Sequence, residues 1–491
     1  MGRRLLVLAE WLVIVLLVAC GSPSSASAPD PTEIAPAPIT ETPTPPPTET
    51  PGPVSTAIVE HYTVKRGETL AYIAQRFGVS LEDLTRLNGL ANPNALQAGQ
   101  VLKIVVQVPR MAPADVLVPD SEAVYGPGYQ SFDTVGFANA KHGYLAMYRE
   151  RVEGDWLTGP EIVQLVAERY SVGPRVLLAL LELESGWVTS QSVPQSDVFN
   201  PLGYGNSQLP SLFIQLSRAA DQLNQGYYEK VSGQPAALEF KDGSRARFAP
   251  TVNAGTAAVQ NALAPIANWN TFQTQVSGTG FLATYRRLFG DPSAYAVSPL
   301  IPPDLKQPKL RLPWSNGTVW YFTGGPHSGW GQYAAWASLD VTPGDVAGSG
   351  TCWPSQDWVL AAASGKVIRA EHGRVVISLE NDDFQGKGWD LLYMHVATNG
   401  RVKEGTTVKV GDRIGHPSCE GGAANASHSH LARLYNGQWI GADKVPFVLS
   451  GWTVVPTDQE YEGKLVRGAE SREACNCRDD SMNAIIADDG P

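Results

Sequence analysis

The spacing of apolar residues along the sequence changes near residue 311, and this change limits the possible folds more than any other feature. Before it, apolar residues recur at helical spacing, as in "EIVQLVAERY" and "PRVLLALLELES". After it, short runs such as "GKVIRAEHGRVVISL" alternate valine and isoleucine with polar residues and are broken by glycine. The first pattern predicts helices and the second predicts strands. Because 491 residues exceed what one core can hold, we expect a multidomain chain: a mostly α-helical region over 115–305 and an antiparallel β-sheet domain over 311–456.

The N-terminus has the pattern of an export signal followed by a spacer. Two arginines precede an apolar run, Leu12–Val18, that is too short to span a bilayer. The "LVAC" that ends it resembles a bacterial lipobox, which implies a lipoprotein signal peptide over 1–20 and a lipid anchor at Cys20; an ordinary cleaved signal is the alternative. Residues 21–58, rich in Pro and Thr, cannot bury enough apolar surface to fold. We therefore expect an extracytoplasmic protein, lipid-anchored to the bacterial cell membrane through a disordered linker.

An ordered unit begins after this linker. The sequence "HYTVKRGETLAYIAQRFGVSLEDLTRLNGL" predicts a short strand and two helices, and "QVLKIV" predicts a closing strand. Thr69 and Ser80 are placed to cap the two helices. In the second helix, the spacing of Leu81, Leu84 and Leu87 predicts that all three side chains point inward.

This βααβ unit, residues 60–106, closely resembles a LysM module. The resemblance implies binding to glycans that contain N-acetylglucosamine, such as peptidoglycan. In that family the sugar groove lies between the loop after the first strand and the loop before the last strand. The residues that match these two glycan-binding loops are Gly67, Glu68, Thr69, Asn92, Pro93 and Asn94.

The helical middle region carries one weaker resemblance. The segment "LLELESGW" resembles the catalytic helix of lysozyme-like lytic transglycosylases, in which Glu184 would be the acid that cleaves glycan. Burial in an apolar pocket raises the pKa of such a carboxyl and lets it protonate a glycosidic oxygen. The Asn-Ala-Gly segment of that family is matched at Asn253, but Val252 stands where its tyrosine is expected. We expect a lysozyme-like fold with weak or no glycosidase activity.

The β-rich region contains three histidine-bearing segments, "GGPHSGWGQYAAWASLDV", "LLYMHV" and "NASHSHLARL". Successive side chains of a strand alternate faces, so His428 and His430 should project onto one surface. Together the segments resemble the lysostaphin-type metallopeptidases, in their β-lytic branch. The resemblance implies a zinc ion bound by His327, Asp340 and His430, a ligand set that leaves a fourth position for water.

Two further histidines would act on the substrate rather than on the metal. The resemblance implies that the catalytic residues His395 and His428 position or deprotonate the attacking water and stabilise the oxyanion. The first two metal ligands are thirteen residues apart in this chain, which fits the long loop of the β-lytic branch.

Charge limits the classes of binding partner. The net charge is −11 and no basic stripe is present, which excludes nucleic acid as an expected partner.

The C-terminal third contains the remaining cysteines. Outside the cytoplasm disulfides can persist, and four cysteines, Cys352, Cys419, Cys475 and Cys477, leave three pairings open. Residues 457–491 are mostly polar, and we expect a C-terminal tail.

These features predict a peptidoglycan hydrolase: a zinc-dependent endopeptidase that cleaves peptide cross-links of the cell wall and is targeted by its LysM module. Two alternatives stay open. A non-catalytic envelope protein would bind the wall and activate separate amidases, and a bifunctional enzyme would add glycan cleavage at Glu184. A regulator is expected to have lost a metal ligand, whereas His327, Asp340 and His430 are all present.

Overall fold

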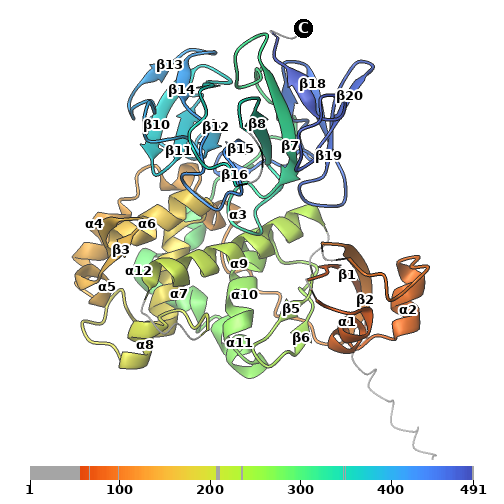
Figure 1. Cartoon of the computed structure of the whole chain (residues 1–491). Helices are drawn as coiled ribbons and strands as arrows, with labels where there is room; N and C mark the ends of the chain where they lie inside the picture. Colours follow the sequence, from red (N-terminus) through yellow and green to blue (C-terminus); the bar gives the residue numbers. More distant parts are fainter. Residues whose placement is uncertain are drawn as a thin grey trace, which may run out of the picture. The chain divides into compact units, whose positions relative to one another are not determined.

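The computed structural model describes residues 56–65, 67–97, 99–205, 211–233, 236–346, 348 and 350–488 (Figure 1). The chain divides into two units, 1–52 and 53–491, and every described element belongs to the second. The expected signal peptide, Cys20 and nearly all of the linker lie outside the described residues. Among the helices of the described ranges, none has the length and apolar character needed to cross a membrane.

The first ordered unit has the expected βααβ order. Its elements are β1 (Thr56–Thr63), α1 (Leu70–Phe77), α2 (Leu81–Leu87) and β2 (Val101–Val108), and the two strands pair antiparallel. Thr69 accepts a hydrogen bond from the Tyr72 amide, and Ser80 accepts one from the Asp83 amide. Both predicted caps are therefore present. The strands are longer than expected, because β1 begins within the stretch that we expected to be linker.

The expectation for the second helix was wrong in part. Only Leu84 is buried, at 2% exposure, whereas Leu81 and Leu87 are 42% and 43% exposed. Residues three apart differ by about 60° around a helix axis, since the turn has about 3.6 residues. In this short helix the central leucine faces the sheet and the flanking two point to either side.

The middle region is built mainly from helices. They are α3 (Asp120–Ala123), α4 (Thr134–Ala140), α5 (Tyr144–Met147), α6 (Gly159–Tyr170), α7 (Pro174–Ser185), α8 (Gln195–Phe199), α9 (Leu212–Ser232), α10 (Ala254–Leu263), α11 (Trp269–Gln275) and α12 (Phe281–Phe289). Two short hairpins accompany them, β3 (Arg149–Val152) with β4 (Asp155–Thr158) and β5 (Leu238–Glu239) with β6 (Arg245–Ala246). A lysozyme-like arrangement of these helices stays a prediction.

Helix α7 shows how local sequence sets an element. It begins with Pro174, whose fixed φ suits the first helical turn, and ends before Gly186, whose φ of 67° suits a left-handed cap. Every residue from Pro174 to Glu182 is buried. The nearly continuous apolar run of this segment is therefore explained by burial on all sides.

The last third forms the expected antiparallel sheet. Its strands follow the order β13-β10-β11-β12-β15-β8-β7-β21, and β16 also pairs with β15. The strands are β7 (Val319–His327), β8 (Ser338–Pro343), β10 (Gly365–Glu371), β11 (Arg374–Ser378), β12 (Trp389–Met394), β13 (Thr407–Val408), β15 (Ser429–Tyr435), β16 (Gln438–Trp439) and β21 (Ala484–Ile486). Smaller sheets comprise β9 (Val359–Leu360) with β14 (Arg413–Gly415), and β17 (Val448–Leu449), β18 (Trp452–Pro456), β19 (Gly463–Arg467) and β20 (Glu470–Glu473).

Both faces of the central strands are covered. Leu391, Tyr393 and Leu431 belong to the core of the sheet domain. Their neighbours Leu392 and Ala432, which alternate to the opposite face, share a second core with buried residues of the helical region. Double-sided burial explains why "WDLLYM" is almost continuously apolar instead of alternating.

The stretch expected as a polar tail is part of this domain. It supplies β19, β20 and β21, and β21 pairs antiparallel with β7. These strands have three to five residues and bury at most two side chains each, so the segment gave no strong strand pattern. The four cysteines form the disulfides Cys352–Cys419 and Cys475–Cys477, which resolves the pairing left open by the sequence.

Candidate metal centre

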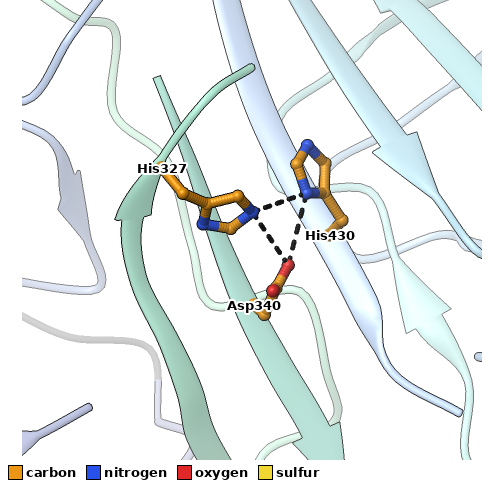
Figure 2. Close-up of side chains that lie close together, drawn as sticks. All are labelled: His327, Asp340 and His430. Carbon is orange, nitrogen blue, oxygen red and sulfur yellow. Dashed lines mark hydrogen bonds and ion pairs between the residues drawn. The ribbon is translucent and has the colours of Figure 1, made fainter. Parts of the chain in front are cut away.

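Three neighbouring strands bring His327, Asp340 and His430 together, and Figure 2 shows their side chains converging. His327 ends β7, Asp340 lies in β8, and His430 is directly opposite Asp340 in the pairing of β15 with β8. One oxygen of Asp340, Oδ1, lies 3.4 Å from His327 Nε2 and 3.3 Å from His430 Nδ1. The two ring nitrogens are 3.0 Å apart. One donor atom from each residue thus lies within 4.8 Å of the others.

The second nitrogen of each ring determines what the first can do. His327 Nδ1 lies 2.8 Å from the Gly325 carbonyl, and His430 Nε2 lies 3.3 Å from the Gly329 carbonyl. A carbonyl only accepts, so these nitrogens carry the protons of the neutral rings. The lone pairs of the other two nitrogens then face each other and the Asp340 carboxylate. Backbone carbonyls commonly orient metal-binding imidazoles in this way.

The donor set therefore fits a divalent cation. Asp340 Oδ1 is buried and accepts no hydrogen bond, so it lacks the compensation that a buried carboxylate requires. Two imidazole nitrogens and one carboxylate oxygen at these separations are the ligands that catalytic zinc prefers. A cation between them would relieve the repulsion between the lone pairs and satisfy the orphaned oxygen.

The charge states are suited to metal binding. Burial opposes ionisation of Asp340, but positive charge beside it, as on the imidazole of His327 or His428, outweighs burial and holds the pKa of the carboxyl well below its usual range. A cation held by the ring lone pairs would act in the same direction. Burial lowers the pKa of His430, which favours the neutral ring. Burial also acts against a charge on His327, yet the adjacent Asp340 carboxylate raises the pKa of that imidazole. A metal ion would compete with this proton for the same lone pair.

The two other predicted histidines lie beside this group. The rings of His395 and His428 have centroids 4.3 Å apart, and His428 Nε2 is 3.7 Å from Asp340 Oδ1. Their Nδ1 atoms lie 2.9 Å and 2.8 Å from the carbonyls of Glu420 and Ala426. Burial, reinforced by His428, lowers the pKa of His395 to about 3, so this ring is neutral. All five residues predicted for the peptidase site thus meet at one place.

Sequence reasoning missed Tyr461, which lies beside the same group. Its ring stacks on His327 with a centroid distance of 4.2 Å and an interplanar angle of 17°. Its backbone bonds hold it there: the amide donates to Pro326 O, and the carbonyl accepts from Gly325 N. Tyr461 has a φ of 68° and remains 53% exposed. The tyrosine in "QEYEG" was the available signal, but its proximity to His327 depends on long-range pairing.

In the middle region Glu184 and Asn253 have different hydrogen-bond partners. Glu184 accepts a hydrogen bond of 2.7 Å from Gln275 Nε2, and burial raises its pKa to about 7. Asn253 instead caps α10 and donates to Val118 O and Asp120 Oδ1. The neighbouring Glu182, rather than Glu184, carries the ion pair with a basic residue, Arg287.

The residues of the expected sugar groove make local bonds. The Glu68 carboxylate accepts from the Tyr62 hydroxyl and from the Lys65 amide. Thr69 is occupied as a helix cap, and Asn92 Oδ1 accepts from the Asn94 amide. Of the six, Gly67, Thr69, Asn92 and Asn94 are exposed, while Glu68 and Pro93 are partly buried.

Comparison with known proteins gives two domain matches. Residues 62–105 match the LysM domain, and residues 116–303 match the N-terminal domain of LasA. Protease LasA of Pseudomonas aeruginosa is 26% identical over 303 residues, which are 57% of this chain. The alignment spans 66% of the length of that protease.

Two solved structures are also similar. The M23 metalloprotease pseudoalterin from the deep sea is 26% identical, with a TM-score of 0.29, over 34% of this chain and 96% of that one. The catalytic domain of lysostaphin from Staphylococcus simulans is 21% identical, with a TM-score of 0.18, over 25% of this chain and 88% of that one. Residues 62–105 and 116–303 thus match the LysM domain and the N-terminal domain of LasA, and the chain is similar to protease LasA over 57% of its length.

Proposed function

We propose that this protein is a zinc-dependent endopeptidase that cleaves peptide cross-links of bacterial peptidoglycan. The observation that carries the proposal is the buried His327–Asp340–His430 group, in which two lone pairs and an unsatisfied carboxylate oxygen converge. The His395–His428 ring pair beside it supports a hydrolytic role, and the similarity to a protein named as a protease agrees with it. The intact ligand set favours an enzyme over a non-catalytic activator of amidases.

In this proposal His327, Asp340 and His430 hold the zinc. A bound zinc ion supplies Lewis acidity and lowers the pKa of a bound water. His428, whose Nε2 faces the Asp340 carboxylate, accepts the proton of the attacking water and later delivers it to the leaving amine nitrogen. His395 stays neutral with its proton on Nδ1, against the Glu420 carbonyl, so its Nε2 lone pair accepts a hydrogen bond from the attacking water and positions it.

The remaining parts would bring this site to its substrate. We propose that the LysM domain binds N-acetylglucosamine-containing glycan through Gly67, Glu68, Thr69, Asn92, Pro93 and Asn94. We also propose that Cys20 carries a lipid, so that the protein acts outside the cytoplasm, anchored to the cell membrane. A Pro-rich linker extends by about 3.1 Å per residue, so it would let the enzyme act at a distance from its anchor.

The metal assignment is tested by one substitution. Purified protein should contain one zinc ion per chain, and His430→Ala should lose both the metal and the cleavage of peptidoglycan peptides. Circular dichroism of the variant and its binding to insoluble peptidoglycan should stay as in the wild type, because the LysM core is separate. Stoichiometric zinc in His430→Ala would refute this ligand set.

Glu184 supports a second candidate activity. A carboxyl that burial keeps protonated near neutral pH is suited to act as a general acid on a glycosidic bond. The test uses the His430→Ala protein on purified glycan strands. Anhydro-sugar products that vanish on Glu184→Gln would make the protein bifunctional, and their absence would leave the middle region as a spacer or a second wall-binding surface.

A further inference from the structure

The segment Ser418–Glu420 lies against both histidines that the proposed mechanism uses but that do not bind the metal. We infer that it acts as a clamp: Ser418, Cys419 and Glu420 are positioning residues that fix His395 and His428 relative to each other. This inference rests on the proposed peptidase function and adds residues that determine its turnover.

Ser418 bonds to the backbones of both histidines. Its amide and its hydroxyl both donate to the His395 carbonyl, at 2.6 Å and 3.0 Å. Its own carbonyl accepts from the His428 amide at 3.3 Å. Ser418 is 2% exposed, so water does not compete for these bonds. One residue therefore sets the spacing between two histidines that are 33 positions apart in the chain.

His395 needs such a support because of its backbone. It follows directly after β12 and has a φ of 63°, in the left-handed region that side-chain-bearing residues seldom adopt. Conformations of this kind persist only where the surroundings impose them, and they gather at functional sites. The two hydrogen bonds from Ser418 to the His395 carbonyl are such a constraint.

Glu420 fixes the ring of the same histidine. Its carbonyl oxygen lies 2.9 Å from His395 Nδ1, so the proton of the neutral ring resides on that nitrogen. Its carboxylate accepts from the Thr398 amide and hydroxyl, and its amide donates to the Ser418 hydroxyl. In the proposed reaction the Nε2 lone pair of His395 accepts a hydrogen bond from the attacking water. The Glu420 carbonyl keeps this lone pair available by holding the proton on Nδ1.

The Cys352–Cys419 disulfide links this clamp to the loop that holds the residue before His428. Cys419 is bonded to Cys352, in a loop whose carbonyls accept from Ser427, the residue before His428. The Ser427 amide donates to Thr351 O at 2.7 Å, and its hydroxyl donates to Trp353 O at 2.6 Å. The cross-link therefore connects the residues that hold His395 with those that hold His428.

Ser418→Ala tests the clamp directly. It removes the hydroxyl bonds to His395 and Glu420 and leaves the backbone bonds in place. We expect kcat to fall on the order of 10-fold, as for other groups that orient catalytic side chains. KM, zinc content and the visible spectrum of the Co²⁺-substituted protein should not change, because none of the metal ligands is touched.

Ser450→Ala is the matched control. Ser450 is equally buried and its hydroxyl also makes two bonds, to Asp488 O and from Leu312 N, but it does not contact a histidine. The control should retain the wild-type kcat. Equal kcat in the two variants, or an altered Co²⁺ spectrum in Ser418→Ala, would overturn the inference. A wild-type protein that cleaves no peptide would instead overturn the proposed function.

The disulfide supplies an independent test. The double variant Cys352→Ala/Cys419→Ala should keep its zinc and lose kcat by a factor on the order of 10 or more. Cys475→Ala/Cys477→Ala removes the other disulfide and should leave kcat within about twofold of the wild type. Equal kcat values in the two double variants would show that the Cys352–Cys419 disulfide does not support turnover.

Discussion

A single carboxylate oxygen, Asp340 Oδ1, lies within 4 Å of three imidazoles. His327 and His430 direct lone pairs at one another, an arrangement that suits a metal ion. The third imidazole, His428, packs against the ring of His395. The sequence could identify these residue types because the segments around them are distinctive. It could not identify Tyr461, since nothing local to that residue indicates that it stacks on His327.

The division of roles predicts separable effects of substitution. His395→Ala and His428→Ala should each lower kcat by a factor on the order of 10² or more, because they remove positioning of the attacking water or proton transfer. Zinc content should stay near that of the wild type in both. Steady-state kinetics combined with metal analysis checks this, and full activity in both variants would mean that the site has been misread.

Glu184 predicts a pH dependence of stability. Its pKa is raised by burial to about 7 from an ordinary 4.5, so the folded protein holds this proton more tightly than the unfolded chain. The contribution of Glu184 to the free energy of unfolding is therefore lost as pH rises from about 4.5 to about 7, and it changes little above that. Glu184→Gln, which retains an acceptor for Gln275, should match the wild type at pH 4 and be more stable at pH 8, by on the order of 3 kcal/mol. Equal thermal stability of the two proteins at pH 8 would contradict this assignment.

At the scale of elements, the neighbouring positions of β15, β8 and β7 explain how ligands from distant parts of the chain meet. The sequence predicted elements with strong local patterns, such as α7 with its proline start and glycine end. It failed at β19, β20 and β21, because these strands have at most five residues and bury at most two side chains each. It also overcounted the inward leucines of α2, because a short helix presents a narrow face.

The pairing of β21 with β7 predicts a contribution to stability from the C-terminal strand. Ile485 is fully buried, and Ile485→Ala should lower the free energy of unfolding by about 2–5 kcal/mol. Its neighbour Ile486 is 59% exposed, and Ile486→Ala should change stability by less than about 0.5 kcal/mol. Denaturant unfolding of both variants provides the comparison. Similar losses at the two positions would show that this strand is not docked as described.

At the scale of the whole molecule, regions that match a LysM domain and a LasA N-terminal domain occur in one chain with an antiparallel sheet that carries a candidate metal site. In the proposed function the LysM region binds glycan and the candidate metal site cleaves peptide bonds, and peptidoglycan contains both. The sequence predicted the order of the domains because each domain has its own spacing of apolar residues. It did not predict the contacts of the helical region with the sheet, because these contacts join residues far apart in the chain.

Anchoring is a prediction about the whole protein. If Cys20 carries a lipid, Cys20→Ser should move the protein from the membrane fraction to the soluble extracellular or periplasmic fraction. Fractionation of cells followed by immunoblotting measures this. Unchanged partitioning would mean that another part of the protein holds it at the membrane.

The most direct test of the central claim is mass spectrometry of purified peptidoglycan after digestion with the zinc-loaded protein. New amino and carboxyl ends should appear within the peptide cross-links and be absent from a His430→Ala digest. Intact cross-links after digestion with protein that contains stoichiometric zinc would contradict that claim.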